Sequence, residues 1–355
     1  MNNVLQNLMR QATQLTQAGR LNEATAAIQR ALSGKASPYE VVADEDLPVK
    51  PAPSRIILDG CVFDAKDESK DAFTSGTHTH ATLTRRYKLY VPAGSAGQQR
   101  PLVVMLHGCT QNPDDFAVGT GMNERAREQG FCVLYPEQSQ DANPQRCWNW
   151  FKHNHQSRGR GEPALIASMT QTIMKEHGID TRRVYIVGLS AGGAMAAIVA
   201  DAYPEIFAAV GVHSGLPNGS ASSVPEALAV MSSGQSANGR PPIRPTQRLM
   251  PTIVFHGDQD RTVHPRNGEQ VVESALGSVG AKSQVKQGVS ANGRRYTSVI
   301  HHGDAGEVLA EHWLVHGAGH AWSGGSSKGS YTDAKGPDAT AEMLRFFFAI
   351  NSEAI

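Results

Sequence analysis

Short apolar runs alternate with helical patterns from residue 86 to residue 350, and this alternation constrains the fold more than any other feature of the chain. Several runs, such as PLVVML and PTIVF, are continuously apolar, as expected of parallel strands covered by helices on both faces. The pattern predicts an α/β domain with a doubly wound, mostly parallel sheet. The predicted strands are Arg86–Val91, Leu102–Leu106, Phe131–Tyr135, Val184–Leu189, Ala208–Val212, Thr252–Phe255 and Glu311–Val315.

Helical patterns fill the intervals between most of these strands. The predicted helices are Asn112–Gln129, Glu162–His177, Ala191–Tyr203, Pro265–Leu276 and Ala339–Ile350. A further strand-like run at Ile56–Phe63 lies close to Arg86–Val91 without a helical pattern between them. We therefore expect these two runs to form an antiparallel edge of the sheet.

The N-terminal part of the chain has a different organisation. Residues 1–34 repeat apolar side chains at three- and four-residue spacing on both sides of Gly19, which predicts a helical hairpin similar to one tetratricopeptide-like unit. One such unit cannot bury its own apolar face, so we expect it to dock on the main domain, with a homo-oligomer formed through the hairpin as the alternative. Residues 35–55 are rich in Pro, Ser and acidic side chains and predict a linker, which leaves 56–355 as the main domain.

Composition excludes several classes of protein. Lys+Arg and Asp+Glu both number 33, so the chain lacks the basic excess of a nucleic-acid-binding protein. No run of about 18 apolar residues is present, which excludes a membrane span. The first 32 residues contain no continuous apolar stretch of the kind found in secretory signals. We therefore predict a cytoplasmic protein, with an extracellular or periplasmic one as the alternative.

A candidate nucleophile lies in the segment VYIVGLSAGGAMAAIVADAY. Ser190 is the central residue of Gly188-Leu189-Ser190-Ala191-Gly192, directly after an apolar strand and directly before a helix of small residues. This is the context of a nucleophile elbow, in which a tight turn exposes the serine hydroxyl at the carboxyl edge of the sheet. We predict that Ser190 is a catalytic nucleophile.

A serine hydroxyl needs a base to take its proton and an acid to orient that base. In folds with a nucleophile elbow the acid and then the histidine follow the serine along the chain. The strand PTIVF leads into HGDQD, where Asp258 and Asp260 compete; we favour Asp260 as the acid and expect Asp258 to shape the turn. Among the later histidines, His320 lies in a loop of small residues after a strand, so we predict it as the base and regard His316 as structural.

The negative charge that develops during acyl transfer needs two N–H donors. One is expected from Ala191, the residue after the nucleophile, and the other from Cys109 in the loop after an earlier strand. His107 belongs to the same loop, and we expect it to shape that loop. Aromatic residues near the sheet edge, above all Trp148 and Trp322, are predicted to line a substrate-binding cleft.

The motifs LHGCTQ, LYPEQ with CWNWF, RVYIVGLSAGGAM, HSGLPNG, HGDQD and GHAWSGG resemble, in this order, those of the polyhydroxybutyrate depolymerase-family esterases. These enzymes are α/β-hydrolases related to feruloyl and acetylxylan esterases. The resemblance covers about Asp59 to Ile350 and implies an α/β-hydrolase fold. It also implies Ser190, Asp260 and His320 as a catalytic triad.

The same resemblance implies that the amides of Cys109 and Ala191 form the oxyanion hole. It further suggests a disulfide between Cys109 and Cys147, which would tie the oxyanion loop to the CWNWF segment. Secreted polymer depolymerases of this kind usually carry a separate polymer-binding domain, and we expect none after Ile355. We therefore expect a soluble ester or oligomer as the substrate.

Together these features predict a serine carboxylic-ester hydrolase that forms an acyl-enzyme, with short hydroxyalkanoate esters or oligomers as substrates. Feruloyl or acetylxylan esterase activity and an acyltransferase with the same triad are the alternatives, and a non-catalytic binding protein is a more distant one. The sequence contains no H-E-x-x-H and no G-x-x-x-x-G-K-[ST] motif, so neither a metal nor a cofactor is expected.

Overall fold

The computed structural model describes residues 55–58, 61–64, 70–94, 98–235 and 249–350. The chain divides into two compact units, Met1–Ala65 and Lys66–Ile355. The predicted helical hairpin of residues 1–34 lies outside the described residues, as does the predicted linker apart from Arg55. In the first unit, strands β1 (Arg55–Leu58) and β2 (Cys61–Asp64) pair with each other in antiparallel fashion.

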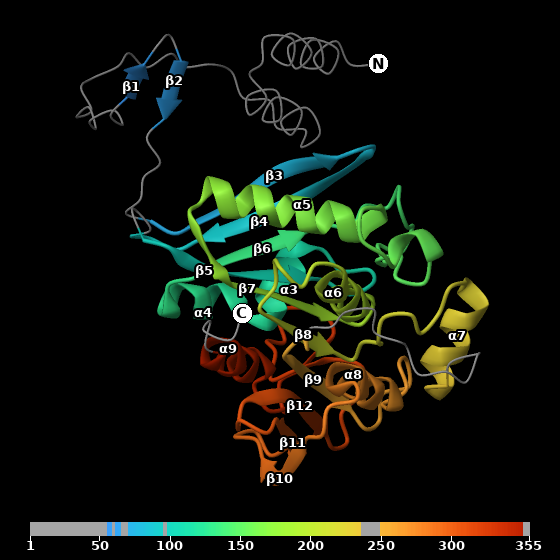
Figure 1. Cartoon of the computed structure of the whole chain (residues 1–355). Coiled ribbons are helices and arrows are strands. Elements are labelled where there is room, and N and C mark those ends of the chain that lie inside the picture. The colour runs from blue at the N-terminus through green and yellow to red at the C-terminus, as the bar shows by residue number, and fades with distance from the viewer. Residues whose placement is uncertain (1–54, 59–60, 65–69, 95–97, 236–248, 351–355) are drawn as a thin grey trace, which may run out of the picture. The chain divides into compact units, whose positions relative to one another are not determined.

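The second unit contains a ten-stranded sheet (Figure 1) in the order β10-β11-β12-β9-β8-β7-β5-β6-β4-β3. Its strands are β3 (Ala72–His80), β4 (Leu83–Val91), β5 (Arg100–Leu106), β6 (Cys132–Pro136), β7 (Ile179–Leu189), β8 (Ala209–His213), β9 (Thr252–Gly257), β10 (Lys282–Val289), β11 (Arg295–His302) and β12 (Val308–Val315). The six central strands from β6 to β12 are parallel, whereas β3, β4, β10 and β11 pair in antiparallel fashion. The prediction of a doubly wound, mostly parallel sheet is confirmed.

Helices cover both faces of the sheet. They are α3 (Pro113–Thr120), α4 (Met122–Gln129), α5 (Gly161–Glu176), α6 (Ala191–Ala202), α7 (Val224–Ser233), α8 (Arg266–Leu276) and α9 (Ala339–Ala349), with a short 3-10 helix at His153–His155. Side chains of α5, α6 and α8 form one apolar core with Leu102, Val104 and Leu106 of β5. Those of α3, α4 and α9 form the other core with Val103 and Met105 of the same strand. The continuous apolar run PLVVML is thus explained, because alternate residues of β5 enter opposite cores.

Three sequence-based expectations about the elements are wrong. Ile56–Phe63 does not form an edge with Arg86–Val91, because the first run pairs with itself as β1 and β2 and the edge partner of β4 is β3. The single helix expected over Asn112–Gln129 is two helices, since Gly121 has a φ of 64° and ends α3. The expected strand set lacked β3, β10 and β11 and the two short strands β13 (Trp322–Ser323) and β14 (Thr332–Asp333).

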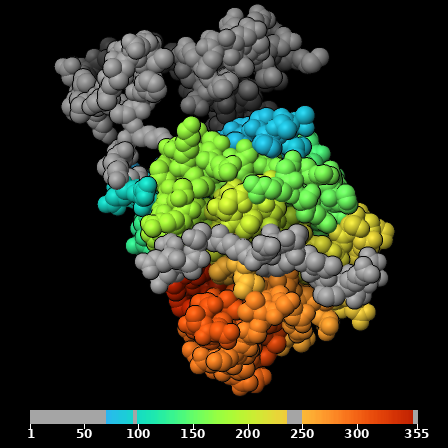
Figure 2. All heavy atoms as spheres, in the orientation of Figure 1, coloured from blue at the N-terminus to red at the C-terminus, as the bar shows by residue number. Residues whose placement is uncertain are grey.

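The hairpin of β10 and β11 extends the sheet beyond β12, at one end of the second unit (Figures 1 and 2). Almost every residue of β10 is exposed, and its sequence KSQVKQGV does not alternate between apolar and polar side chains. A strand that covers no core leaves no period-two pattern in the sequence. This is why the sequence analysis did not find it.

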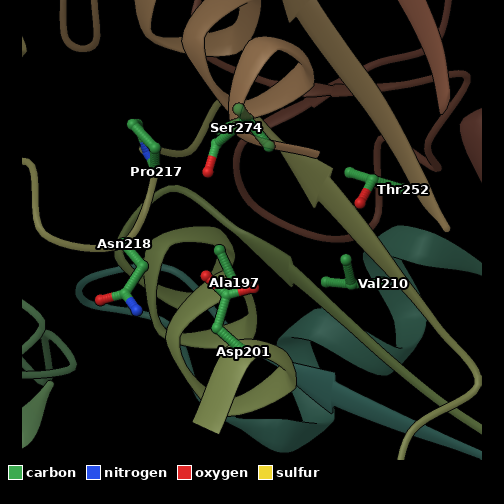
Figure 3. A pocket seen from close by; sticks show the side chains of 8 residues that line it. Ala197, Asp201, Val210, Pro217, Asn218, Thr252 and Ser274 are labelled. Atoms are coloured by element: carbon green, nitrogen blue, oxygen red, sulfur yellow. The ribbon is translucent and has the colours of Figure 1, made fainter. Parts of the chain in front are cut away.

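A small cavity of about 10 Å³ lies between α6, α8 and the amino-terminal ends of β8 and β9 (Figure 3). Ala197, Val210, Thr252 and Ser274 are among the residues that line it. Its volume corresponds to a single water molecule. Pro217 and Asn218 of the segment after β8 also belong to the lining, which includes none of the predicted catalytic residues.

A buried carboxylate fixes the CWNWF segment, which begins at Cys147. Glu162, which is 0% exposed, accepts hydrogen bonds from the Asn149 backbone N–H at 2.7 Å and from Gln138 Nε2 at 2.5 Å. The Arg85 guanidinium lies 3.4 Å from the same carboxylate. Burial raises the pKa of Glu162, but hydrogen bonds from His155, Gln138 and Asn149 outweigh it and lower the pKa below its ordinary value.

Replacing this carboxylate should destabilise the domain. We expect Glu162→Gln to lower the free energy of unfolding by about 3 kcal/mol, because it leaves the buried Arg85 charge without its counter-charge. Denaturant unfolding followed by circular dichroism measures the loss. The matched control is Glu128→Gln in the exposed pair with Arg125, expected to change stability by less than about 0.5 kcal/mol. Equal effects of the two substitutions would contradict this account.

Candidate active site

Ser190 occupies a strained turn between β7 and α6. Its backbone has φ 58° and ψ −120°, a conformation that residues with a side chain rarely adopt. The Ser190 N–H donates to the carbonyl of His213, at the end of the neighbouring strand β8, with a distance of 2.9 Å. The residue is 8% exposed. The turn therefore holds the serine at the carboxyl edge of the sheet, as the sequence motif predicted.

The two glycines that flank the serine are required by close backbone contacts. A Cβ atom on Gly188 would lie 2.1 Å from the carbonyl oxygen of Gly192, and one on Gly192 would lie 2.1 Å from that of Leu106. The elbow thus packs directly against itself and against the end of β5. No side chain fits at either glycine without displacing backbone.

Asp260 and His320 come together as predicted. Asp260 follows β9 in a short loop, and its Oδ2 lies 2.7 Å from His320 Nδ1. Its Oδ1 accepts the backbone N–H groups of Thr262 and Val263, each at 2.9 Å. Burial raises the pKa of Asp260, but hydrogen bonds with His256 and His320 and the amide of Val263 hold it well below the ordinary value. Asp260 is therefore a carboxylate whose Oδ2 faces the imidazole of His320.

The hydrogen bonds among the described residues include none between Ser190 Oγ and His320. Catalytic hydrogen bonds of this type are often long in the absence of substrate. The base and the nucleophile are linked instead through His213, whose backbone binds the elbow and whose ring Nε2 accepts the N–H of Ser323 at 2.9 Å. The side chain of His320 is 12% exposed, so it retains some access to solvent.

The second acid and histidine of the same two loops have a separate role. Asp258 Oδ2 lies 3.0 Å from His316 Nδ1, and its Oδ1 accepts the Gly317 N–H at 2.7 Å. The other ring nitrogen of His316 lies 2.8 Å from Thr297 Oγ1 on β11. Asp258 and His316 thus clamp the base loop to the loop after β9. The expectation that both residues are structural agrees with these contacts.

The loop after β5 is tied down at several points. Cys109 forms a disulfide with Cys147, so the pairing implied by the resemblance is present. Gly108 N–H donates to Gln111 Oε1, and Thr110 N–H donates to Gln145 O. The amide of Cys109 between them has no acceptor within the part of the chain that the structure describes, which leaves it available as an oxyanion donor.

The structure also shows the positions of Ala191 and His107, the other two residues predicted to act at or near this loop. Ala191 is the first residue of α6, and the first amides of a helix lack partners in the helix itself. His107 is buried, and its Nε2 accepts the N–H of Gln138 at 3.1 Å. Burial lowers the pKa of His107 to about 4, so it is a neutral residue that shapes the loop.

The prediction that Trp148 and Trp322 line a substrate cleft is wrong. Trp148 is 0% exposed and its Nε1 donates to His107 O, while Trp322 is 1% exposed and donates to Thr340 Oγ1. Both indoles are packed in the cores, because an aromatic residue near a sheet edge gains most by burial under its own loop. The two side chains support their loops from within the cores.

Sequence reasoning missed two buried histidines beside the acid and base. His213 ends β8, and His256 lies on β9 with its Nε2 3.4 Å from Asp260 Oδ2 and 2.8 Å from Val263 O. A signal was present, since each histidine stands at the carboxyl end of a strand, directly before a Ser-Gly or a Gly-Asp pair. Polar residues at that position are often functional in open α/β sheets.

A cleft of about 620 Å³ opens beside the two loops that carry the acid and the base. Its walls come from the ends of β10 and β11 and from the residues that follow β9 and β12. They are Asp258, Gln259, Gln287, Gly288, Val289, Arg295, Tyr296, Thr297, His316 and Gly317. The cleft is large enough for a small organic molecule.

A parallel sheet with covering helices, a nucleophile elbow, and an acid and a histidine on later loops in that order define an α/β-hydrolase of the serine type. The profile of the family described as "Esterase PHB depolymerase" matches residues 85–293, and the chain belongs to this family. The match includes Ser190 and Asp260, whereas His320 lies beyond its end.

Two named proteins with similar sequences agree with the assignment to this esterase family. The chain is 31% identical over 239 residues to poly(3-hydroxyalkanoate) depolymerase C of Paucimonas lemoignei, covering 65% of this chain and 57% of that protein. It is 28% identical over 220 residues to feruloyl esterase B of Thermothelomyces thermophilus, covering 58% and 74%. The match thus spans just over half the length of the first relative and about three quarters of the second.

A solved structure supports the fold. The acetyl xylan esterase from Aspergillus awamori superimposes with a TM-score of 0.59 at 19% identity, over 78% of this chain and 99% of that one. The α/β-hydrolase fold is therefore confirmed. In the described part of the chain, no helix is both long and apolar enough to span a membrane.

The elbow geometry makes a stability prediction. We expect Gly192→Ala to lower the free energy of unfolding by at least about 2 kcal/mol, because the new methyl group meets the backbone of β5. Thermal and denaturant unfolding measure the change. Gly280→Ala is the control, since a Cβ there has no atom within 4 Å. A Gly192 variant as stable as the Gly280 variant would show that the elbow is not packed as described.

Proposed function

We propose that the protein is a serine carboxylic-ester hydrolase that acts through an acyl-enzyme on short hydroxyalkanoate esters and oligomers. The observation that carries the proposal is the 2.7 Å hydrogen bond between Asp260 and His320, at the sheet edge where the strained turn presents Ser190. Family membership and the named depolymerase relative support the ester chemistry and the acyl group.

In the proposed reaction Ser190 Oγ attacks the ester carbonyl carbon while His320 Nε2 takes the hydroxyl proton. Asp260 accepts the Nδ1–H of His320, which fixes the ring tautomer and stabilises the imidazolium. The amides of Cys109 and Ala191 donate to the oxyanion. The alcohol leaves with the proton held by His320, and a water molecule activated by the same ring then cleaves the acyl-enzyme and restores Ser190.

The cleft beside the acid and base loops supports an extended substrate. Its volume of about 620 Å³ exceeds what a short acyl group alone would fill. Its lining includes Tyr296 and Val289 and the glutamines Gln259 and Gln287, whereas Ser190, Asp260 and His320 lie outside that lining. An oligoester presents methyl groups and carbonyl acceptors along one chain, so apolar surface and N–H donors in one groove fit it. A free oligomer suits this groove better than a solid polymer surface does.

The disulfide supports an oxidising compartment, and we propose a periplasmic or extracellular location in place of the cytoplasmic one. Alkylation of free thiols in intact producing cells, before lysis, tests it. We expect Cys109 and Cys147 to resist alkylation until a reductant is added, and the protein to be found outside the cytoplasmic fraction. Recovery of both residues in alkylated form from the cytoplasm would refute the location.

The triad assignment predicts large losses of activity. We expect Ser190→Ala to lower kcat/KM for p-nitrophenyl butyrate about 10⁴- to 10⁶-fold, because the acyl-enzyme cannot form. Asp260→Asn should cost about 10³- to 10⁴-fold, because the amide favours the wrong tautomer of His320. Asp258→Asn, at the structural partner of His316, should retain activity within about tenfold. If Asp258→Asn were the more damaging of the two, the acid would be misassigned.

The same wild-type protein tests the substrate class. We compare kcat/KM for 3-hydroxybutyrate dimers and trimers with the values for a feruloyl ester and an acetylated xylooligosaccharide. The proposal expects the hydroxybutyrate oligomers to be the best substrates and the trimer to exceed the dimer. Preference for either sugar ester would retain the serine-hydrolase mechanism and refute the substrate class.

A further inference from the structure

His213 links the segments that carry the three proposed catalytic residues. It is the last residue of β8, between β7 and β9, and it is 1% exposed. Its carbonyl oxygen accepts the Ser190 N–H at 2.9 Å. The backbone of His213 thus holds the strained turn that carries the nucleophile.

The imidazole of His213 makes the second link. Its Nε2 accepts the N–H of Ser323 at 2.9 Å, three residues after His320. Because Nε2 accepts, the ring proton is on Nδ1, which lies 3.1 Å from Ser214 Oγ and donates to it. Both nitrogens are therefore used, and the ring performs this role only in its neutral form.

The surroundings keep the ring neutral. Burial, together with the nearby His256 and His320, lowers the pKa of His213 well below its ordinary value, against the opposing effect of Asp260. A protonated ring would lose its acceptor and point an N–H at the N–H of Ser323. The hydrogen bond to the base loop is thus preserved at neutral pH.

Stacking completes the arrangement. The His213 ring lies 5.0 Å from the indole of Trp322 at an interplanar angle of 26°, and 5.8 Å from the ring of Phe255 at 17°. Trp322 is two residues after His320, and Phe255 is on β9, whose end leads to Asp260. One imidazole therefore contacts the base loop and the acid strand, while its own backbone binds the nucleophile turn.

We propose that His213 is a positioning residue, whose imidazole fixes the His320 loop against the turn that carries Ser190. The inference rests on the proposed function. It matters because Ser190 and His320 share no hydrogen bond in the described structure, so their separation depends on the scaffolds that carry them. A misplacement of about 1 Å between reacting groups can cost on the order of 100-fold in rate.

The segment that follows His320 is also bound by contacts with residues other than His213. Trp322 Nε1 donates to Thr340 Oγ1 on α9, and Ser323 Oγ donates to Pro337 O. These bonds fix the loop to the C-terminal segment, on the side of the α9 core. Loss of the His213 ring should therefore leave the loop folded and shift it relative to the elbow.

The test compares two substitutions at His213. His213→Leu fills the space without an acceptor, and His213→Gln restores an acceptor oxygen on a flexible stem. For p-nitrophenyl butyrate we expect His213→Leu to lower kcat about 10- to 100-fold with KM changed less than about twofold. His213→Gln should recover at least about a third of the wild-type kcat. The rate of labelling by a fluorophosphonate probe should follow kcat in both variants.

A merely structural histidine gives a different result. In that case both variants would unfold more easily, yet the kcat of the folded fraction, counted by complete fluorophosphonate labelling, would equal that of the wild type. Equal losses in the Leu and Gln variants would also overturn the proposal, since the acceptor would then be irrelevant. If His213→Leu does not fold by circular dichroism, His213→Asn replaces it, because its shorter side chain does not reach Ser323.

A matched control is His312→Gln on β12. His312 is a partly buried histidine whose pKa is lowered to about 4, chiefly by burial, and its Nε2 has no hydrogen-bond partner among the described residues. We expect this variant to keep kcat within about twofold of the wild type. If the wild-type protein neither hydrolyses the ester nor reacts with the probe, the proposed function is refuted. If the wild type is active and the His213 variants have the same kcat, only the positioning role of His213 is refuted.

Discussion

The turn at Ser190 is the constraint on which the rest of the site depends. A backbone with φ 58° and ψ −120° costs on the order of 1–3 kcal/mol and persists only where its surroundings enforce it. Here β7 and α6 are buried along almost their whole length, and Gly188 and Gly192 allow the turn to pack on itself and on β5. Core packing of two elements thus supports one strained residue and presents its hydroxyl at the sheet edge.

The remaining chemistry comes from loops, and each loop is tied by a different interaction. A disulfide holds Cys109 to Cys147, Glu162 binds the segment after Cys147, and the clamp of Asp258 and His316 joins the acid loop to the base loop. All of these ties join one part of the protein to another. Their effect is to order groups before substrate arrives, which removes that entropic cost from the reaction.

The sequence located Ser190, Asp260 and His320 at one edge of the sheet because each follows a strand with a recognisable local pattern. A strand followed by G-x-S-x-G needs the elbow, and an acid or a histidine in a loop after a late parallel strand must reach the same edge. Trp148 and Trp322 carried no such signature, because a loop indole packs inward or outward according to tertiary contacts alone. The strand β10 was missed for a related reason. Its residues are almost all exposed, so they show no alternation of apolar and polar side chains.

The two histidines beside the triad show what a local motif cannot reveal. His213 contacts residues at positions 190, 255 and 322–323, which are far apart in the sequence. They meet because β8 lies between β7 and β9 in the sheet and because the chain returns to this edge after β12. Its burial at a polar edge would be costly if either ring nitrogen lacked a partner. Both ring nitrogens are paired, and the ring also stacks on residues beside the acid and the base. The hydrogen bonds and the stacking therefore fix the same thing, which is the position of the base loop relative to the turn at Ser190. Such a residue stabilises the positions of the loops relative to one another more than it stabilises the fold of any single loop.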